Sequence, residues 1–215
     1  CDGGYVSACG LYARYLIDHK KLYDKGLKLY LRQCTASIGQ GCHSAGNLFY
    51  YHYNDLVNAA KMQSKACDLG VDLGCSRAAQ YYYRLGNAKK YVPLLKRSCR
   101  AGYNFTCVVY GDYFLNQKKL KRALQLFLKG CKSYGIGCFK AGKLLLNKLQ
   151  KPKVGVRLLV QGCDMKFGEA CQVLGELYAT GTTLPLSVKK GQFYFAKACT
   201  LGVKKACILG KGKGK

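Results

Sequence analysis

Ser187 and Lys190 come closer than any other residues of the chain to a catalytic pattern. They form S-x-x-K in the stretch SVKK, the motif in which the serine of β-lactamases and penicillin-binding proteins acts as a nucleophile. Those enzymes also need S-D-N and K-T-G elements, and neither occurs in this sequence. Ser187 also stands where a helix is expected to begin, so we interpret it as a helix N-cap beside a lysine. A β-lactam hydrolase stays the alternative function.

Carboxylates and histidines give no second catalytic pattern. Glu169 and Glu176 are the only glutamates, and their separation of seven residues, about 10 Å along a helix, does not set them across a substrate as in a glycosidase. His19, His43 and His52 have no nucleophile at a suggestive spacing, so we expect surface or capping histidines. The sequence contains no C-x-x-C. We therefore expect no catalytic residue, no metal site and no cofactor.

The 14 cysteines form seven neighbouring pairs, six with seven residues between the sulfurs and one with six. An even and regular set favours disulfides in an oxidising compartment, the periplasm or the cell exterior. The alternative is a cytosolic solenoid with reduced cysteines. The expected bridges are Cys1–Cys9, Cys34–Cys42, Cys67–Cys75, Cys99–Cys107, Cys131–Cys138, Cys163–Cys171 and Cys199–Cys207.

The cysteine pairs also reveal an internal repeat. Their first members recur every 32 to 36 residues, a period that is typical of solenoids. A small residue follows six of the seven second cysteines by four positions and a large apolar one by seven, offsets that lie on one helical face. A similar stripe precedes the six pairs that follow the first. We predict two antiparallel helices of 11 to 14 residues per repeat. Residues 1–210 would form a single all-α solenoid of about six repeats, the first incomplete, and residues 211–215 a basic Gly/Lys tail.

The chain must reverse direction between the two cysteines of each pair. Residues eight apart in one helix are separated by about 12 Å of rise, whereas bridged Cα atoms lie roughly 4.4–6.8 Å apart. A glycine stands three residues after the first cysteine in four pairs, and glycine suits the left-handed conformation that ends a helix. These glycines are Gly4, Gly70, Gly102 and Gly202. Each bridge is then expected to join the end of one helix to the start of the next.

The last unit carries a family resemblance. CQVLGELYATGTTLPLSVKKGQFYFAKACTLGVKKAC combines L-G-x-L-Y, a glycine-containing turn and K-A-C-x-x-G before a second cysteine. It resembles the Sel1-like repeat, specifically the disulfide-stapled Helicobacter cysteine-rich proteins. The other units have shorter turns and lack the L-G pair at the place of Leu174 and Gly175, so the chain looks like a divergent member. The resemblance implies a right-handed superhelix of tetratricopeptide-like hairpins, export, and protein interaction at the envelope or with a host. It also implies the alternative of a weak penicillin-binding protein or β-lactamase.

The charge of the chain points to an acidic partner. Lys and Arg number 36 against 10 Asp and Glu, a net charge of +26, and residues 76–163 hold 19 basic residues and one acid, Asp112. Such a field attracts acidic proteins and polyanions. We expect a protein partner, with an anionic glycolipid such as lipopolysaccharide as an alternative. Nucleic acid is less favoured because the aromatic residues lie mostly at core offsets. No apolar run has the roughly 20 residues of a membrane span.

The first helix of each repeat is expected to line a concave groove, as in related helical-repeat solenoids. Its groove positions lie two, five and nine residues after the second cysteine, and the residues of the middle row are polar and differ from repeat to repeat. This variation is expected of a groove that reads partner side chains; the alternative is a solvated face without a partner. The predicted binding residues are Arg14, Asn47, Tyr51, Arg77, Gln80, Arg84, Asp112, Lys140, Lys143 and Glu176. The predicted function is an exported, non-catalytic scaffold that binds an acidic partner through its concave and basic faces, as a component of a larger envelope complex.

Overall fold

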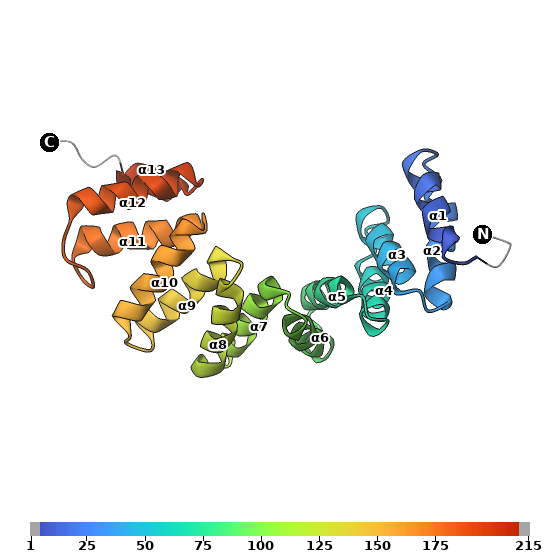
Figure 1. Ribbon diagram of the computed structural model, residues 1–215, viewed down its shortest axis with the longest axis horizontal. Coiled ribbons are helices and arrows are strands. Elements are labelled where there is room, and N and C mark those ends of the chain that lie inside the picture. Colours follow the sequence, from blue (N-terminus) through green and yellow to red (C-terminus); the bar gives the residue numbers. More distant parts are fainter. Residues whose placement is uncertain (1–4, 211–215) are drawn as a thin grey trace. The chain divides into compact units, whose positions relative to one another are not determined.

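The computed structural model describes residues 5–210, and every regular element in this range is an α-helix (Figure 1). The all-α prediction is therefore confirmed. The helices are α1 (Ala8–Asp18), α2 (Tyr23–Thr35), α3 (Gly39–Tyr51), α4 (Leu56–Asp68), α5 (Asp72–Arg84), α6 (Ala88–Arg100), α7 (Asn104–Asn116), α8 (Leu120–Cys131), α9 (Gly135–Asn147), α10 (Pro152–Asp164), α11 (Gly168–Thr180), α12 (Val188–Thr200) and α13 (Lys204–Gly210).

The chain divides into two compact units, Cys1–Tyr103 with α1–α6 and Asn104–Lys215 with α7–α13. Within each unit a helix packs mainly against the helices that precede and follow it, which is the pattern of an α-solenoid. A single solenoid over residues 1–210 stays a prediction, and the predicted tail, 211–215, lies outside the described residues. None of the helices in the described range is long and apolar enough to cross a bilayer.

The core of each unit is built from large residues of one helix that fill gaps left by small residues of its neighbour. A Cβ added to Gly111 would lie 2.6 Å from Cε1 of Phe127, and one added to Gly175 would lie 2.6 Å from Cδ1 of Phe195. This is the close approach that the repeat predicted. The buried residues four positions before the first cysteine are Tyr30, Gln63, Leu95, Phe127, Leu159 and Phe195.

Disulfides close the corners between repeats. Each bridge with defined geometry joins the last turn of one helix to the first turns of the next, with Cα atoms 4.4–4.7 Å apart. These bridges are Cys34–Cys42, Cys67–Cys75, Cys131–Cys138, Cys163–Cys171 and Cys199–Cys207. Cys9, Cys99 and Cys107 are also disulfide-bonded, and the described residues include no free cysteine. Cys1 lies outside that range.

The corners that carry the predicted glycine in the described range turn through a residue in the left-handed conformation, as predicted. Gly70, Gly102 and Gly202 have φ angles of 86°, 91° and 87°, whereas Gly4 lies outside the described residues. Ser37 and Lys166 take the same place in other repeats with φ of 61° and 62°. The left-handed residue is therefore a property of corners with this cysteine spacing, and glycine is only its least strained occupant. The Cys131–Cys138 corner is one residue shorter, and Tyr134 in the equivalent place is extended, with φ of −132°.

The residue immediately before the second cysteine is also constrained, although the sequence pattern did not single it out. A Cβ on Gly41 would lie 2.9 Å from the carbonyl oxygen of Tyr30, and one on Gly137 would lie 2.4 Å from the backbone nitrogen of Cys131. At these two positions the obstructing atoms include backbone atoms, so a side chain there would require the corner itself to shift. The place is held by buried Gly41, Gly74, Thr106, Gly137, Ala170 and Ala206.

Candidate functional site

The predicted binding residues all lie on the first helices of the repeats, and none of them is buried. In the first unit Arg14 is on α1, Asn47 and Tyr51 are on α3, and Arg77, Gln80 and Arg84 are on α5. In the second unit Asp112 is on α7, Lys140 and Lys143 are on α9, and Glu176 is on α11. The structure brings together some of these side chains within each unit.

In the first unit, two arginines of α5 are held by two tyrosines of α3. Nη1 of Arg77 donates to the hydroxyl of Tyr51 at 2.8 Å, and this hydrogen bond raises the pKa of Arg77, which keeps the guanidinium charged. Nη1 of Arg84 donates to the hydroxyl of Tyr50. The guanidinium carbons lie 5.9 and 5.6 Å from the respective ring centroids. Tyr50 was not among the predicted residues.

Asn47 belongs to a polar network beneath the same surface. Gln63 Oε1 accepts from His43 Nδ1 at 2.8 Å, and Asn47 Nδ2 lies 3.1 Å from His43 Nε2. Gln63 Nε2 donates in turn to Asn47 Oδ1 at 2.9 Å and to the His43 carbonyl at 3.1 Å. Because an amide oxygen faces Nδ1, the imidazole carries its proton there and accepts at Nε2. The network therefore holds neutral His43 and fixes the Asn47 side chain.

One of the three histidine predictions is wrong. His19 and His52 are the C-cap residues of α1 and α3, as expected of capping histidines. His43 is buried instead, with 7% of its surface exposed. The buried amide of Gln63 satisfies the ring and makes this burial possible. Burial lowers the pKa of His43, and the nearby charge of Arg77 lowers it further.

In the second unit, the acidic members of the predicted row are paired. Lys140 Nζ lies 2.8 Å from Asp112 Oδ1. Glu176 Oε1 accepts from Gln172 Nε2 at 2.7 Å and lies 3.9 Å from Lys205 Nζ. A depression of about 600 Å³ separates Glu176 from Lys143. Its other lining residues are Leu146, Asn147, Gln150, Pro152, Val173, Leu177 and Thr183.

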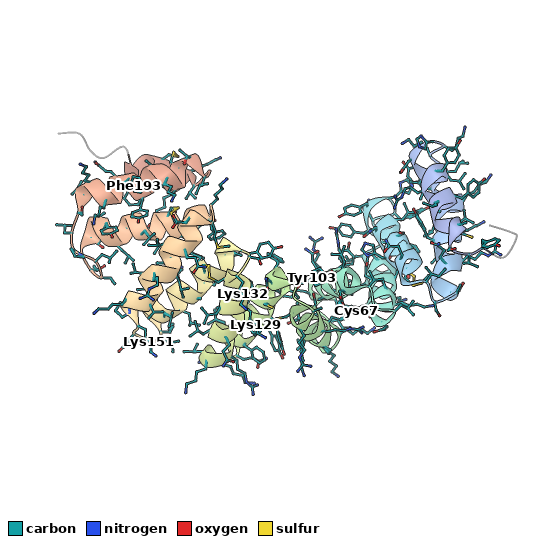
Figure 2. All side chains as sticks on the ribbon, in the orientation of Figure 1. Cys67, Tyr103, Lys129, Lys132, Lys151 and Phe193 are labelled. Atoms are coloured by element: carbon teal, nitrogen blue, oxygen red, sulfur yellow. A yellow bond between two sulfur atoms is a disulfide. The ribbon has the colours of Figure 1, made fainter. Side chains whose placement is uncertain are left out.

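Basic residues gather on α8, α10 and the turns next to them. We call this set the basic face: Lys118, Lys119, Lys121, Arg122, Lys129, Lys132, Lys148, Lys151, Lys153 and Arg157. All ten are exposed, and Figure 2 labels Lys129, Lys132 and Lys151. The ion pairs found within residues 104–210 are Lys140–Asp112, Lys197–Asp164 and Lys205–Glu176. The basic face thus has no carboxylate partner in the described part of this unit.

Ser187 is the N-cap of α12, as its position in the sequence predicted. Its backbone is extended, with φ of −155°, and its side-chain oxygen accepts from the backbone N–H of Lys190 at 3.4 Å. The ammonium of Lys190 lies 5.4 Å from the ring centroid of Tyr178. In this arrangement the serine contacts the lysine through the lysine's backbone, and the lysine side chain packs on an aromatic ring.

No family model and no curated protein matches the sequence. Solved structures do match the fold. c5321, a protective antigen present in uropathogenic Escherichia coli strains displaying an SLR fold, gives a TM-score of 0.80 at 14% identity over 96% of this chain. A Sel1 repeat protein from Oxalobacter formigenes gives 0.77 at 14% identity over 100% of this chain and 68% of its own.

A further match has a known assembly. The APC/C hetero-tetramer Cut9-Hcn1 gives a TM-score of 0.57 at 13% identity, over 97% of this chain and 46% of the other. The present chain spans only about half the length of c5321, 48%. These likenesses agree with the helix hairpins and with the sequence resemblance. The chain therefore has the fold of Sel1-like repeat proteins, an α-solenoid of helix hairpins.

Proposed function

We propose that this chain is a non-catalytic binding scaffold that acts in the periplasm or outside the cell. It holds an acidic protein partner within a larger envelope complex. The observation that carries the proposal is the basic face, where ten exposed cations meet no carboxylate in the described part of their unit. Uncompensated charge of this density steers acidic surfaces toward the protein.

The disulfides support the proposed location. Bridges at successive corners persist only where the surroundings are oxidising, and the described chain has no free thiol. Bound cysteines also leave little sulfur chemistry available, which agrees with a scaffold role.

The repeat fold supports the proposed mode of action. Solenoids present rows of side chains that differ from repeat to repeat, and partners read those rows. One structure of similar fold, Cut9-Hcn1, was solved as a hetero-tetramer. We transfer from it only the idea that a helical-repeat surface holds another protein.

The test is capture of a partner from envelope extracts by the oxidised protein, at low and at high salt. The variant reverses Lys121, Arg122, Lys129 and Lys132 to glutamate. Its matched control reverses four exposed lysines of the first unit, Lys20, Lys21, Lys25 and Lys28, and so carries the same net charge.

We expect a stoichiometric acidic protein that the control retains and the basic-face variant loses. Equal losses in both variants, spread over many anionic species and abolished by salt, would contradict a shaped interface and favour a general polyanion binder. Capture of lipopolysaccharide or nucleic acid in place of a protein would likewise contradict the proposal and favour a polyanion binder.

A further inference from the structure

The Tyr–Arg pairs of α3 and α5 form a second surface, distinct from the basic face and in the other unit. Arg77 and Arg84 each donate one guanidinium N–H to a tyrosine hydroxyl. A guanidinium has five N–H groups, so each arginine keeps donors that a ligand can use. The two guanidinium groups are therefore preorganised for a ligand.

No carboxylate in the described part of the first unit compensates these two arginines. Its aspartates are occupied or lie at helix ends: Asp24 accepts from the Tyr53 hydroxyl, Asp55 caps α4, and Asp68 pairs with Arg97. The other two are Asp18, the last residue of α1, and Asp72, the first of α5. Arg77 and Arg84 contact tyrosine hydroxyls in their place, and a hydroxyl carries no charge.

The tyrosines are fixed in turn, so that the arginine positions are defined. The ring of Tyr50 stacks on buried Tyr81 with centroids 4.7 Å apart. The ring of Tyr51 packs edge-on against that of Tyr50 with centroids 4.9 Å apart. Holding a flexible arginine before binding lowers the entropy that a ligand must overcome. Tyr51 itself is 64% exposed and offers an aromatic surface beside Arg77.

We propose that Arg77 and Arg84 form a two-point carboxylate clamp that binds an extended acidic segment of the partner. The proposal rests on the proposed function and names the chemistry of that partner. Each arginine would take one carboxylate through two parallel N–H···O bonds, the geometry for which guanidinium is best suited. Gln80 lies between them on α5, where its exposed amide can bind the segment's backbone.

The spacing of the clamp selects the segment. Seven residues of helix separate Arg77 from Arg84, a rise of about 10 Å. A polyproline II segment has three residues per turn and about 3.1 Å of rise per residue, so acidic residues three apart lie on one side about 9 Å from each other. Next to Tyr51 a hollow of about 230 Å³ is lined by Ile17, Tyr30, Ser44, Asn47 and Leu48. It has room for an apolar side chain of the same segment.

The probe is a fluorescent, end-blocked, proline-rich peptide with one leucine and two glutamates three positions apart. Binding to the full oxidised chain is measured by fluorescence anisotropy. The comparison peptide has glutamines in place of both glutamates. We expect the glutamate peptide to bind at least tenfold more tightly, and Arg77→Gln or Arg84→Gln to remove that preference.

Matched variants separate a clamp from general charge attraction. Arg100→Gln removes the same charge from an exposed position on α6 and is expected to bind the peptide as the wild type does. Tyr51→Phe keeps the ring but frees Arg77, so we expect a loss of about threefold. Circular dichroism of each variant checks that the helices are intact.

The result that overturns the clamp is equal affinity for the two peptides, or equal losses in Arg77→Gln and Arg100→Gln. Binding to phosphatidylglycerol vesicles without peptide binding would overturn it as well. Partner capture by the basic-face variant, compared with capture by the clamp variants, separates failure of the clamp from failure of the proposed function. If it loses the envelope partner while the clamp variants keep it, the clamp fails and the proposed function stands. If the glutamate peptide binds through Arg77 and Arg84 but no acidic partner is captured, the proposed function fails alone.

Discussion

Nδ1 of His43 lies 2.8 Å from Oε1 of Gln63, and this contact joins α3 to α4 inside the core. Gln63 is fully buried at a place that five other repeats give to tyrosine, leucine or phenylalanine. The two residues, with Asn47, satisfy one another completely only when the imidazole is neutral. A proton on Nε2 would face the amide hydrogens of Asn47 and break the network.

We predict that stability falls in mild acid because of His43. Its folded-state pKa is lowered by burial and by Arg77, so the unfolded chain binds this proton more readily than the folded chain does. Stability then rises with pH, and it is lost as pH falls below the unfolded value of about 6.5. Urea midpoints at pH 7.5 and 5.5 measure this loss. The change in urea midpoint between the two pH values should be smaller in His43→Gln than in the wild type, whereas in His19→Gln it should equal that of the wild type. An equal change in the wild type and in His43→Gln would refute the assignment to His43.

Removing one bridge is expected to loosen one corner. In the chain-entropy account, a loop of this length contributes about 2.5 kcal/mol. Cys67→Ser with Cys75→Ser should therefore lower the free energy of unfolding by about that amount and speed amide exchange in α4 and α5. Cys199→Ser with Cys207→Ser should move the fast exchange to α12 and α13. Exchange that rises equally in both variants along the whole chain would contradict nearest-neighbour stabilisation.

Ser187→Ala is expected to act on stability alone. Loss of an N-cap costs about 1 kcal/mol, and Ser187→Asp, which restores a capping oxygen, should recover most of it. Thermal unfolding measures both variants. A chromogenic cephalosporin tests the alternative function: we expect equal turnover in the wild type and Ser187→Ala at high protein concentration. Hydrolysis that disappears in Ser187→Ala would restore the enzyme hypothesis.

Two glycine substitutions should differ sharply in cost. Gly86 has φ of 69° and open space where a methyl group would stand, so Gly86→Ala costs only backbone strain, about 1 kcal/mol. At Gly137 a methyl would lie 2.4 Å from the Cys131 nitrogen and 2.5 Å from the Gly130 carbonyl carbon. We expect Gly137→Ala to cost about 3 kcal/mol or more, because the obstructing atoms are backbone. Equal denaturation midpoints would show that the corner can yield.

The sequence was sufficient to predict the helices and their corners because two constraints act together there. The cysteine spacing excludes a continuous helix, and offsets of four and seven select one face. The left-handed φ of Ser37 and Lys166 escaped prediction because a polar side chain tolerates that conformation at a cost that the corner can bear. Glycine is the residue type that reveals such a position in a sequence.

The candidate site was predicted less completely. The repeat offsets located Tyr51, Arg77 and Arg84, but not Tyr50, which stands one position outside the row. Its hydroxyl on α3 accepts a hydrogen bond from Arg84 on α5. Burial of His43 depends on Gln63, a residue 20 positions away. The ion pair between Lys140 and Asp112 spans 28 residues. Contacts of this range come from packing between helices and leave no local signal in the sequence.

The bridges also set how the protein would respond to a pulling force. Each one closes a corner between two hairpins, as Cys67–Cys75 does between α4 and α5, and none of the defined bridges ties together the two helices within a hairpin. Under tension a hairpin can unravel while its corners stay shut. A closed corner withholds seven or eight residues, roughly 25 Å of extended chain. A chain built in this way would lengthen under load hairpin by hairpin, and the closed corners would keep neighbouring helix ends together for refolding.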